Sequence, residues 1–232
     1  MNADQWTKLL EVLVTLLQAI SWPLIILLVL HTLRTPLRKL LEDKNISDFT
    51  FKASPTGGIE ATYKRQQIEV ASSLLNAEEK QSKDQAANLQ NVQTIATVVD
   101  QYITPQNSQK VLGKSILWVD DRPSNNIYER RALATLGISV TICTSTEVAL
   151  ELLQYERYDA IISDMGRPPD PRAGYTLLAK IQEMKINVPY IIYAAGGNYP
   201  QHQAEARSKG AFGSISGASG LLELVMRALT GT

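Results

Sequence analysis

Apolar and polar residues alternate in three different ways along this chain. Residues 12–30 form an apolar run without a charged side chain. Residues 63–103 are rich in Gln, Glu, Lys, Ala and Asn and contain neither Gly nor Pro. Beyond residue 114, short apolar runs alternate with amphipathic stretches. These patterns predict, in order, a membrane helix, a long polar helix and an α/β domain.

The apolar run has the length and the flanks of a transmembrane helix. At 1.5 Å per residue it would span about 28 Å, close to the hydrocarbon thickness of a bilayer. Arg34, Arg38 and Lys39 follow it, so the positive-inside rule places the rest of the chain in the cytoplasm. We predict a single-pass anchor within residues 1–41, with a helix at about 12–33, in the inner (cytoplasmic) membrane. An interfacial or re-entrant helix and a soluble core helix are the alternatives.

Residues 42–113 are expected to connect this anchor to the second domain. Residues 49–51 and 59–63 flank the sequence SPTGG and could form a small hairpin. A heptad seam with 3,4 spacing follows: Ile68, Ala71, Leu75, Glu78, Ser82, Gln85, Leu89, Val92, Ala96, Val99 and Ile103. The seam predicts a connector helix that forms a homo-oligomer as a coiled coil. The alternative is one solvated helix whose stripe packs on a neighbouring domain.

Residues 114–232 read as five strand–helix units. The expected strands are 115–119, 138–142, 158–163, 190–193 and 211–215, and the expected helices are 124–136, 146–155, 174–184, 201–209 and 221–229. Five such units imply a parallel sheet covered by helices on both faces. Ligands of these sheets bind beyond the carboxyl ends of the strands.

Three carboxylates occupy such strand ends. Asp120 and Asp121 follow the first strand, and Asp164 follows the third. Carboxylates that are brought together repel one another, and a hard cation such as Mg²⁺ relieves the repulsion through oxygen ligands. The sequence therefore predicts a Mg²⁺ site at this edge of the sheet.

The sequence ILWVDD, the run ISDM and the five strand–helix units resemble the receiver domain of two-component response regulators. The resemblance implies a flavodoxin-like (βα)5 fold with a five-stranded parallel sheet. It also implies that Asp164 accepts a phosphoryl group, while Asp120, Asp121 and the backbone carbonyl of Gly166 hold Mg²⁺. The donor would be a histidine kinase or a phosphotransfer protein.

Other positions depart from the receiver pattern. Receivers carry Thr or Ser after the fourth strand, where this chain has Ala194, and Lys after the fifth strand, where it has Gly217. The aromatic switch position falls on Ser214. A bound phosphoryl group would lose a charge-assisted contact of about 1.5–3 kcal/mol and a neutral one of about 1 kcal/mol.

A Pro-rich loop, MGRPPDPRAGY, follows Asp164. Its Arg167 and Arg172, with Arg122 on the same rim, could replace the missing Lys as an anion clamp. They could equally bind a nucleotide or form surface ion pairs, which contribute little stability.

Charge and composition narrow the function further. Acidic and basic residues balance at 23 each, and no basic recognition helix is evident, so we expect no nucleic-acid partner. The single cysteine, Cys143, lies beside an apolar strand and is expected to be a structural thiol.

We therefore expect a membrane-anchored signalling protein rather than an enzyme, which relays phosphorylation of its receiver-like domain to the membrane segment or to a partner. One alternative is a pseudo-receiver that senses nucleotides or binds proteins without phosphotransfer. Another is a flavodoxin-like hydrolase, but Glu129 and Glu147 read as helix-surface residues and His202 has no evident acid partner.

Overall fold

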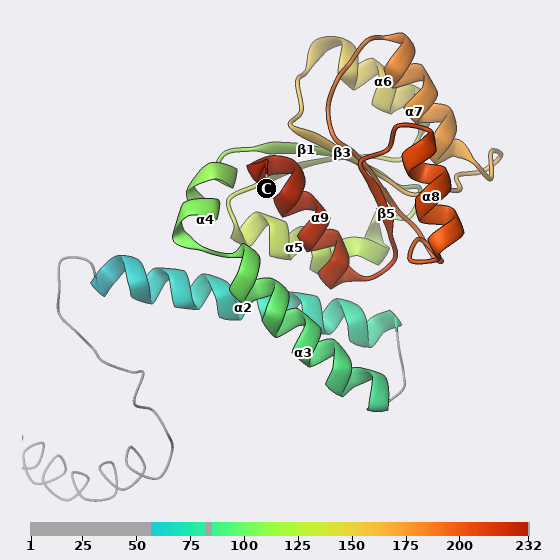
Figure 1. The fold of residues 1–232 in the computed structure, drawn as a ribbon. Helices are drawn as coiled ribbons and strands as arrows, with labels where there is room; N and C mark the ends of the chain where they lie inside the picture. Colours follow the sequence, from blue (N-terminus) through green and yellow to red (C-terminus); the bar gives the residue numbers. More distant parts are fainter. Residues whose placement is uncertain (1–56, 82–84, 232) are drawn as a thin grey trace, which may run out of the picture. The chain divides into compact units, whose positions relative to one another are not determined.

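The computed structural model describes residues 57–81 and 85–231 (Figure 1). The predicted transmembrane helix at about 12–33 lies outside these residues, as does the first strand of the predicted hairpin. Within residues 57–81 and 85–231, no helix is both long and apolar enough to cross a membrane.

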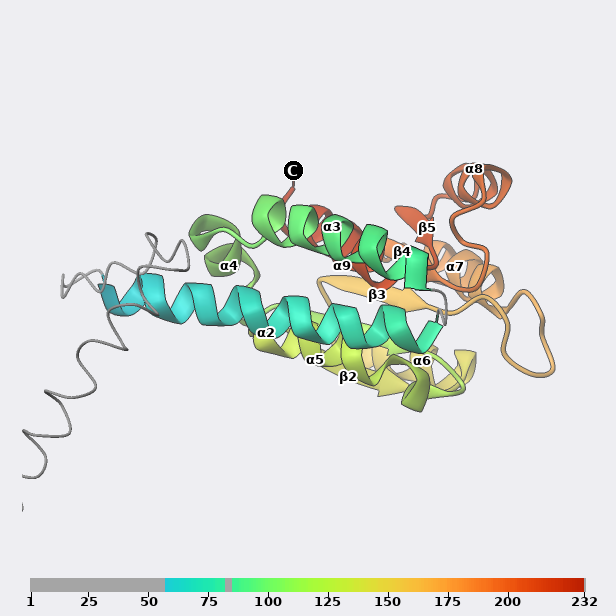
Figure 2. The same ribbon diagram turned by 90° about the horizontal axis from the view of Figure 1, so that it is seen from below.

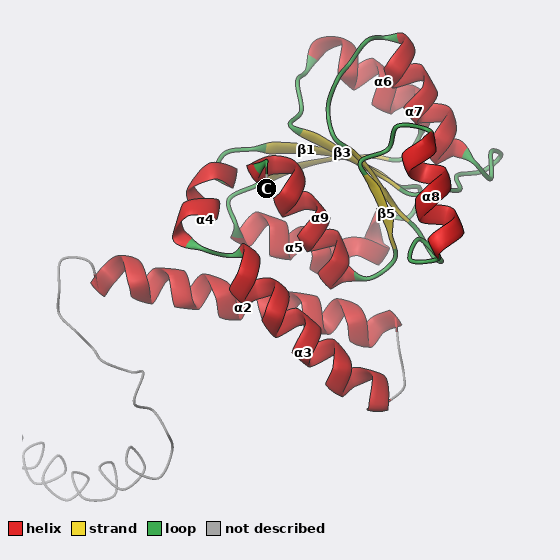
Figure 3. Cartoon of the chain, in the orientation of Figure 1, coloured by secondary structure: helices red, strands yellow, loops and turns green. Residues whose placement is uncertain are grey.

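A parallel sheet with helices on both sides forms the centre of the fold (Figure 3). It has five strands in the order β2-β1-β3-β4-β5. Its strands are β1 (Ser115–Val119), β2 (Ser139–Cys143), β3 (Ala160–Ser163), β4 (Tyr190–Tyr193) and β5 (Gly213–Ile215). Strands β3 and β4 are buried throughout, because helices cover both faces of the sheet. The five-stranded parallel sheet predicted from the sequence is confirmed.

Successive residues of a strand point to opposite faces, which divides the core in two. Ile116 and Trp118 pack with one set of helices, whereas Leu117 and Val119 pack with the other. The first face is covered by α5 (Ile127–Thr135), which a short 3₁₀ turn η1 (Pro123–Asn126) precedes, and by α9 (Ala218–Thr230). The second face is covered by α6 (Thr146–Tyr155), α7 (Ala173–Glu183) and α8 (Pro200–Ser208).

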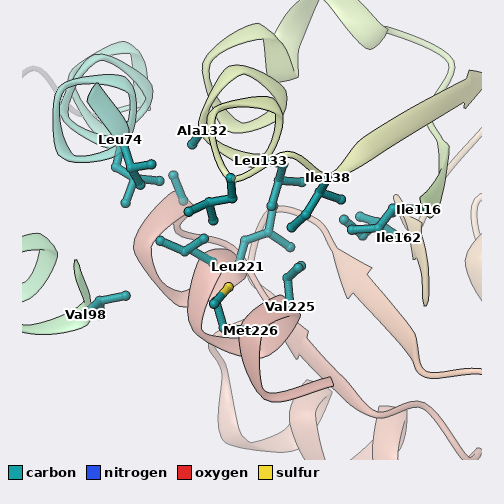
Figure 4. Packing of buried hydrophobic residues seen from close by; sticks show 14 of the residues in the cluster. Leu74, Val98, Ile116, Ala132, Leu133, Ile138, Ile162, Leu221, Val225 and Met226 are labelled. Atoms are coloured by element: carbon teal, nitrogen blue, oxygen red, sulfur yellow. The ribbon is translucent and has the colours of Figure 1, made fainter. Parts of the chain in front are cut away.

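Three further helices precede the sheet and pack against the face that carries α5 and α9. They are α2 (Gly57–Gln81), α3 (Gln85–Tyr102) and α4 (Pro105–Val111), and Figure 2 shows α2 and α3 beside that face. Leu74 of α2 and Val98 of α3 belong to the same buried cluster as Leu133 and Leu221 (Figure 4). Residues 58–232 therefore form one compact unit.

The connector differs from the prediction in two ways. It is helical, but as the two helices α2 and α3 rather than as one. On α2 the deeply buried residues are Val70, Leu74 and Ala77, while Ile68 of the predicted seam is 68% exposed. The buried stripe lies one residue away from the predicted one, because α5 and α9 select which face of α2 is covered. Self-association through these helices stays a prediction.

The hairpin predicted around SPTGG is wrong in its second strand, because residues 59–63 lie in α2. Tyr63 and Gln67 are four residues apart, which places them on one face of a helix. The Tyr63 hydroxyl accepts a hydrogen bond of 2.7 Å from Gln67 Nε2, one further turn along α2. The Gly57–Gly58 pair thus begins a helix instead of turning a hairpin.

Candidate functional site

A cleft of about 1040 Å³ opens at the carboxyl ends of β1, β3 and β4. This is where parallel α/β sheets bind their ligands. Its walls come from the segments that follow these strands and β5: Asp120, Asp121, Arg122, Asn125, Asn126, Asp164, Met165, Gly166, Arg167, Pro168, Pro169, Asp170, Pro171, Tyr193, Ala194, Ala195 and Ser216.

The three predicted carboxylates meet in this cleft. Asp120, Asp121 and Asp164 each offer one oxygen, and these oxygens lie within 4.8 Å of one another. Opposite oxygen ligands of a cation with metal–oxygen distances of about 2.0–2.6 Å lie roughly 4–5 Å apart. The three side chains therefore fit around one divalent cation, and Gly166, the fourth predicted ligand, lines the same cleft.

Asp120 is buried and held at both carboxylate oxygens. Its Oδ1 accepts a hydrogen bond of 2.6 Å from the backbone N–H of Arg122, and its Oδ2 accepts one of 2.5 Å from Asn126 Nδ2. Its own N–H donates to the carbonyl of Cys143, continuing the β1–β2 ladder by one residue. The turn after β1 therefore fixes the direction of this carboxylate.

Arg167 is the cation of the acidic cluster. Its side chain is only 4% exposed, and its Nη1 lies 2.5 Å from Asp164 Oδ1. Nη1 also donates to Ser163 Oγ at 2.8 Å, and Nη2 donates to Thr146 Oγ1 at 3.1 Å. The backbone of Arg167 pairs with that of Asp170 in both directions, which closes the Pro-rich loop on itself.

The other predicted clamp residues lie elsewhere. Arg172 forms an ion pair with Glu205 and lies over the ring of Tyr175, 5.0 Å from its centroid. Arg122 is largely exposed, with its Nε 3.7 Å from Asp121 Oδ2. Of the predicted arginines, Arg167 alone is buried against a site carboxylate, whereas Arg172 forms the surface ion pair that was one alternative.

Burial and charge act on Asp164 in opposite directions. Loss of hydration favours the neutral acid, and the charge of Arg167 opposes this effect. The negative charges of Asp120 and Asp121 again favour the neutral form. The result is a pKa of Asp164 raised to about 6, so this carboxylate is ionised at neutral pH and takes up a proton in mildly acidic solution.

The receiver positions that this sequence has changed are occupied by small residues. Ala194 follows β4 and lines the cleft, and Gly217 lies two residues after the end of β5, next to Ser216 of the cleft wall. Glu78 of α2 approaches Gly217, where a Cβ atom would lie 3.2 Å from Glu78 Oε1. The same oxygen accepts hydrogen bonds from the N–H and the hydroxyl of Ser219, at 3.1 and 3.2 Å. A helix from outside the sheet domain thus reaches the edge of the site.

Two features of this region were not predicted. Glu129 is only 3% exposed and accepts a 2.8 Å hydrogen bond from the Tyr193 hydroxyl, so its assignment as a helix-surface residue is wrong. Lys80 of α2 donates to the carbonyls of Ser124 and Asn125, at 3.3 and 3.1 Å, beside the acidic pair. Both depend on contacts between segments far apart in the sequence, which the pattern of α5 alone does not reveal.

Comparisons with known proteins agree with the fold of the sheet domain. Residues 116–228 match the family model of the response regulator receiver domain, which confirms for these residues the resemblance seen in ILWVDD and ISDM. The two-component response regulator ARR14 of Arabidopsis thaliana is 33% identical over 95 residues, covering 40% of this chain and 24% of that protein. The sensor protein EvgS of Escherichia coli K12 is 31% identical over 121 residues, covering 52% of this chain and 9% of that protein.

The chain thus spans a quarter or less of these curated relatives. Among solved structures, the receiver domain of the Francisella response regulator 1452 is 22% identical, with a TM-score of 0.46. That match covers 51% of this chain and 98% of the Francisella domain.

Proposed function

We propose that the receiver domain at residues 116–228 accepts a phosphoryl group on Asp164. The observation that carries this proposal is the meeting of Asp120, Asp121 and Asp164 in one cleft, with oxygen spacings that suit a single cation. Mg²⁺ would be held by these three carboxylates and by the backbone carbonyl of Gly166, since hard cations prefer oxygen ligands.

In this reaction the ionised Asp164 attacks the phosphorus of a phosphohistidine on a histidine kinase or phosphotransfer protein. The new P–O bond forms as the P–N bond breaks, and the imidazole leaves with the electron pair and takes up a proton. Mg²⁺ held by the three carboxylates would supply positive charge to the phosphoryl oxygens. Asp120 stays in place because the Arg122 N–H and Asn126 hold both of its oxygens.

The α2 helix offers a route from this site to the N-terminal part of the chain. Lys80 contacts the segment that follows the acidic pair, and Glu78 contacts the first turn of α9. Both residues lie near the C-terminal end of α2. In the sequence, the N-terminal end of α2 follows the predicted anchor at residues 12–33. We propose that this helix relays phosphorylation to that segment, in the inner membrane, or to a partner.

A second candidate is a pseudo-receiver that binds a nucleotide or a protein without phosphotransfer. It is favoured by Ala194 and Gly217, which offer no hydroxyl and no ammonium group to a phosphoryl group. It is disfavoured by the complete set of three carboxylates and their spacing.

The deciding experiment adds Mg²⁺ and beryllium fluoride, a phosphoryl mimic, to the purified full chain and follows the bound mimic by ¹⁹F NMR. Saturable binding that requires Mg²⁺ and disappears in Asp164→Asn is expected. A parallel reaction with acetyl phosphate, followed on a phosphate-affinity gel, should give a shifted band only with Asp164 intact. Failure of the wild-type chain in both assays would select the pseudo-receiver.

The relay is tested by hydrogen exchange of α2 with and without the mimic. Exchange near residue 80 is expected to slow when the mimic binds, and Lys80→Met should remove most of that change. Lys110→Met, which removes an exposed charge from α4, is the matched control. Equal responses in the two variants would contradict a relay through Lys80.

A further inference from the structure

Arg167 is buried among groups that all lie within the receiver domain. Its guanidinium donates to Asp164, to the hydroxyl of Ser163 at the end of β3 and to the hydroxyl of Thr146 at the start of α6. Asp164 is the only carboxylate among the hydrogen-bond acceptors that the described residues offer it. Among its hydrogen-bond partners, this cation therefore has one negative charge, the charge that phosphorylation changes.

Phosphorylation moves this negative charge. With phosphorus bonded to one carboxylate oxygen, the other becomes the uncharged oxygen of an acyl group, and the charge passes to the phosphoryl oxygens. A buried guanidinium that loses its anion is strongly unfavourable unless another anion is within reach. The phosphoryl oxygens are attached to the same carboxyl group and provide that anion.

The guanidinium also has one N–H group that makes no hydrogen bond to the described residues. Among the described residues, Arg167 Nε has no hydrogen-bond partner although it is buried. Arginine presents its N–H groups as a planar fork that suits phosphate oxygens, and charge-assisted bonds of this type are the stronger ones. The buried guanidinium beside Asp164 thus has one N–H that is not used by any acceptor among the described residues.

Other cations are poorly placed for this role. Within residues 57–81 and 85–231, no lysine lines the cleft. The Arg122 side chain is 73% exposed and lies beside Asp121, while Arg172 is engaged with Glu205. Arg167 is the one arginine of the lining that is already in contact with the carboxyl group to be modified.

We propose that Arg167 binds the phosphoryl group on Asp164, exchanging its ion pair with the carboxylate for hydrogen bonds to the phosphoryl oxygens. The proposal rests on the proposed function of Asp164. Receivers make the cationic contact to the phosphoryl group with the Lys after the fifth strand, where this chain has Gly217. The proposal assigns that contact to Arg167. The same guanidinium binds Thr146, the first residue of α6, and Ser163, the last residue of β3. Its movement would therefore change contacts at the start of α6 and the conformation of the Pro-rich loop that carries Arg167.

The test measures two affinities of the full chain, for Mg²⁺ alone by calorimetry and for beryllium fluoride at saturating Mg²⁺ by ¹⁹F NMR. Arg167→Gln is expected to weaken binding of the mimic on the order of tenfold to a hundredfold, the loss of one or two charge-assisted hydrogen bonds. Its affinity for Mg²⁺ should be retained or raised, because a cation that competes for Asp164 has been removed. Arg172→Gln removes the same charge from the same loop and should bind both probes as the wild type does.

Arg167→Lys keeps the charge but loses the fork, and it decides the matter should Arg167→Gln fail to fold. Weakened binding of the mimic with Mg²⁺ affinity retained supports the proposal. Wild-type affinity for the mimic in the Arg167 variants overturns it while leaving phosphorylation of Asp164 intact. Loss of Mg²⁺ binding together with the mimic would mean that Arg167 only maintains the structure, and this also overturns it. If the wild-type chain binds no mimic, as is expected of Asp164→Asn, the proposed function itself is contradicted.

Discussion

Replacing Leu74 by alanine tests whether α2 is part of the folded core. Leu74 is 1% exposed and lies in one cluster with Leu133 of α5 and Leu221 of α9. Truncation of a fully buried leucine costs about 2–5 kcal/mol, from lost transfer energy and from the cavity left behind. For a compact unit of this size, each kcal/mol lowers the melting temperature by about 2–4 °C. Leu74→Ala should therefore lower the melting temperature by roughly 4–20 °C.

The matched control is Ile68→Ala, one and a half turns earlier on the same helix. Ile68 is 68% exposed, so its truncation should change the free energy of unfolding by less than about 0.5 kcal/mol. Both variants would be unfolded by heat and, separately, with urea, and followed by far-ultraviolet circular dichroism at several protein concentrations. The heptad seam requires the opposite order, with Ile68 in the interface and a midpoint that depends on concentration. A larger loss for Ile68→Ala than for Leu74→Ala would refute the docking of α2 described above.

Three further predictions concern titratable groups. Burial raises the pKa of Glu129 above its usual 4.5, so the folded protein binds this proton more tightly than the unfolded chain and loses stability as pH rises through the raised value. Glu129→Gln should reduce this decline in stability with pH and should be more stable than the wild type near pH 8. Urea titrations at two pH values measure the free energy of unfolding, and an equal loss of it in both proteins as pH rises would contradict this. The pKa of Asp164 is about 6, so the affinity for Mg²⁺ measured by calorimetry should fall by up to roughly tenfold per pH unit below pH 6. A Mg²⁺ affinity that is constant down to about pH 5 would contradict this prediction. Cys143 is 4% exposed and burial raises its pKa to about 11, so a thiol reagent should label it only after unfolding; rapid labelling of the folded chain would argue against a structural thiol.

The sheet and its acidic cluster could be predicted because both depend on local sequence. A central parallel strand is buried on both faces, so it reads as a short unbroken apolar run, and the residues that follow it must lie at the ligand-binding edge. Asp120 and Asp164 follow β1 and β3, which are neighbours in the sheet. Once the strands were placed, the meeting of these two carboxylates required no knowledge of side-chain packing.

The position of α2 could not be predicted in the same way. Two stripes with 3,4 spacing run along this helix one residue apart, through Val70 and Leu74 or through Ala71 and Leu75. Both suit an amphipathic helix, and only the surface that receives the helix decides between them. That surface is formed by α5 and α9, far away in the sequence.

The burial of Arg167 against Asp164 could not be predicted from the sequence for a related reason. In the sequence it stands in a polar loop rich in proline, where an arginine is usually exposed. Its burial depends on Ser163 and Thr146, whose hydroxyls accept from the guanidinium. The two hydroxyls come from different strand–helix units, and nothing in the sequence of the loop indicates that they meet.

The contacts of α2 imply that its docking and the chemistry of the cleft depend on each other. Among the described residues, the ammonium of Lys80 is held by two uncharged carbonyls beside the acidic pair, so negative charge added on Asp164 should attract it further. If the phosphoryl group tightens the docking of α2, then loosening α2 must weaken binding of the phosphoryl mimic by the same factor, since coupling between two sites is reciprocal. Leu74→Ala should therefore lower the affinity for beryllium fluoride although Leu74 lies in the core and not in the cleft. Ile68→Ala should leave that affinity unchanged, and an equal effect of both variants would mean that the cleft acts independently of the helix.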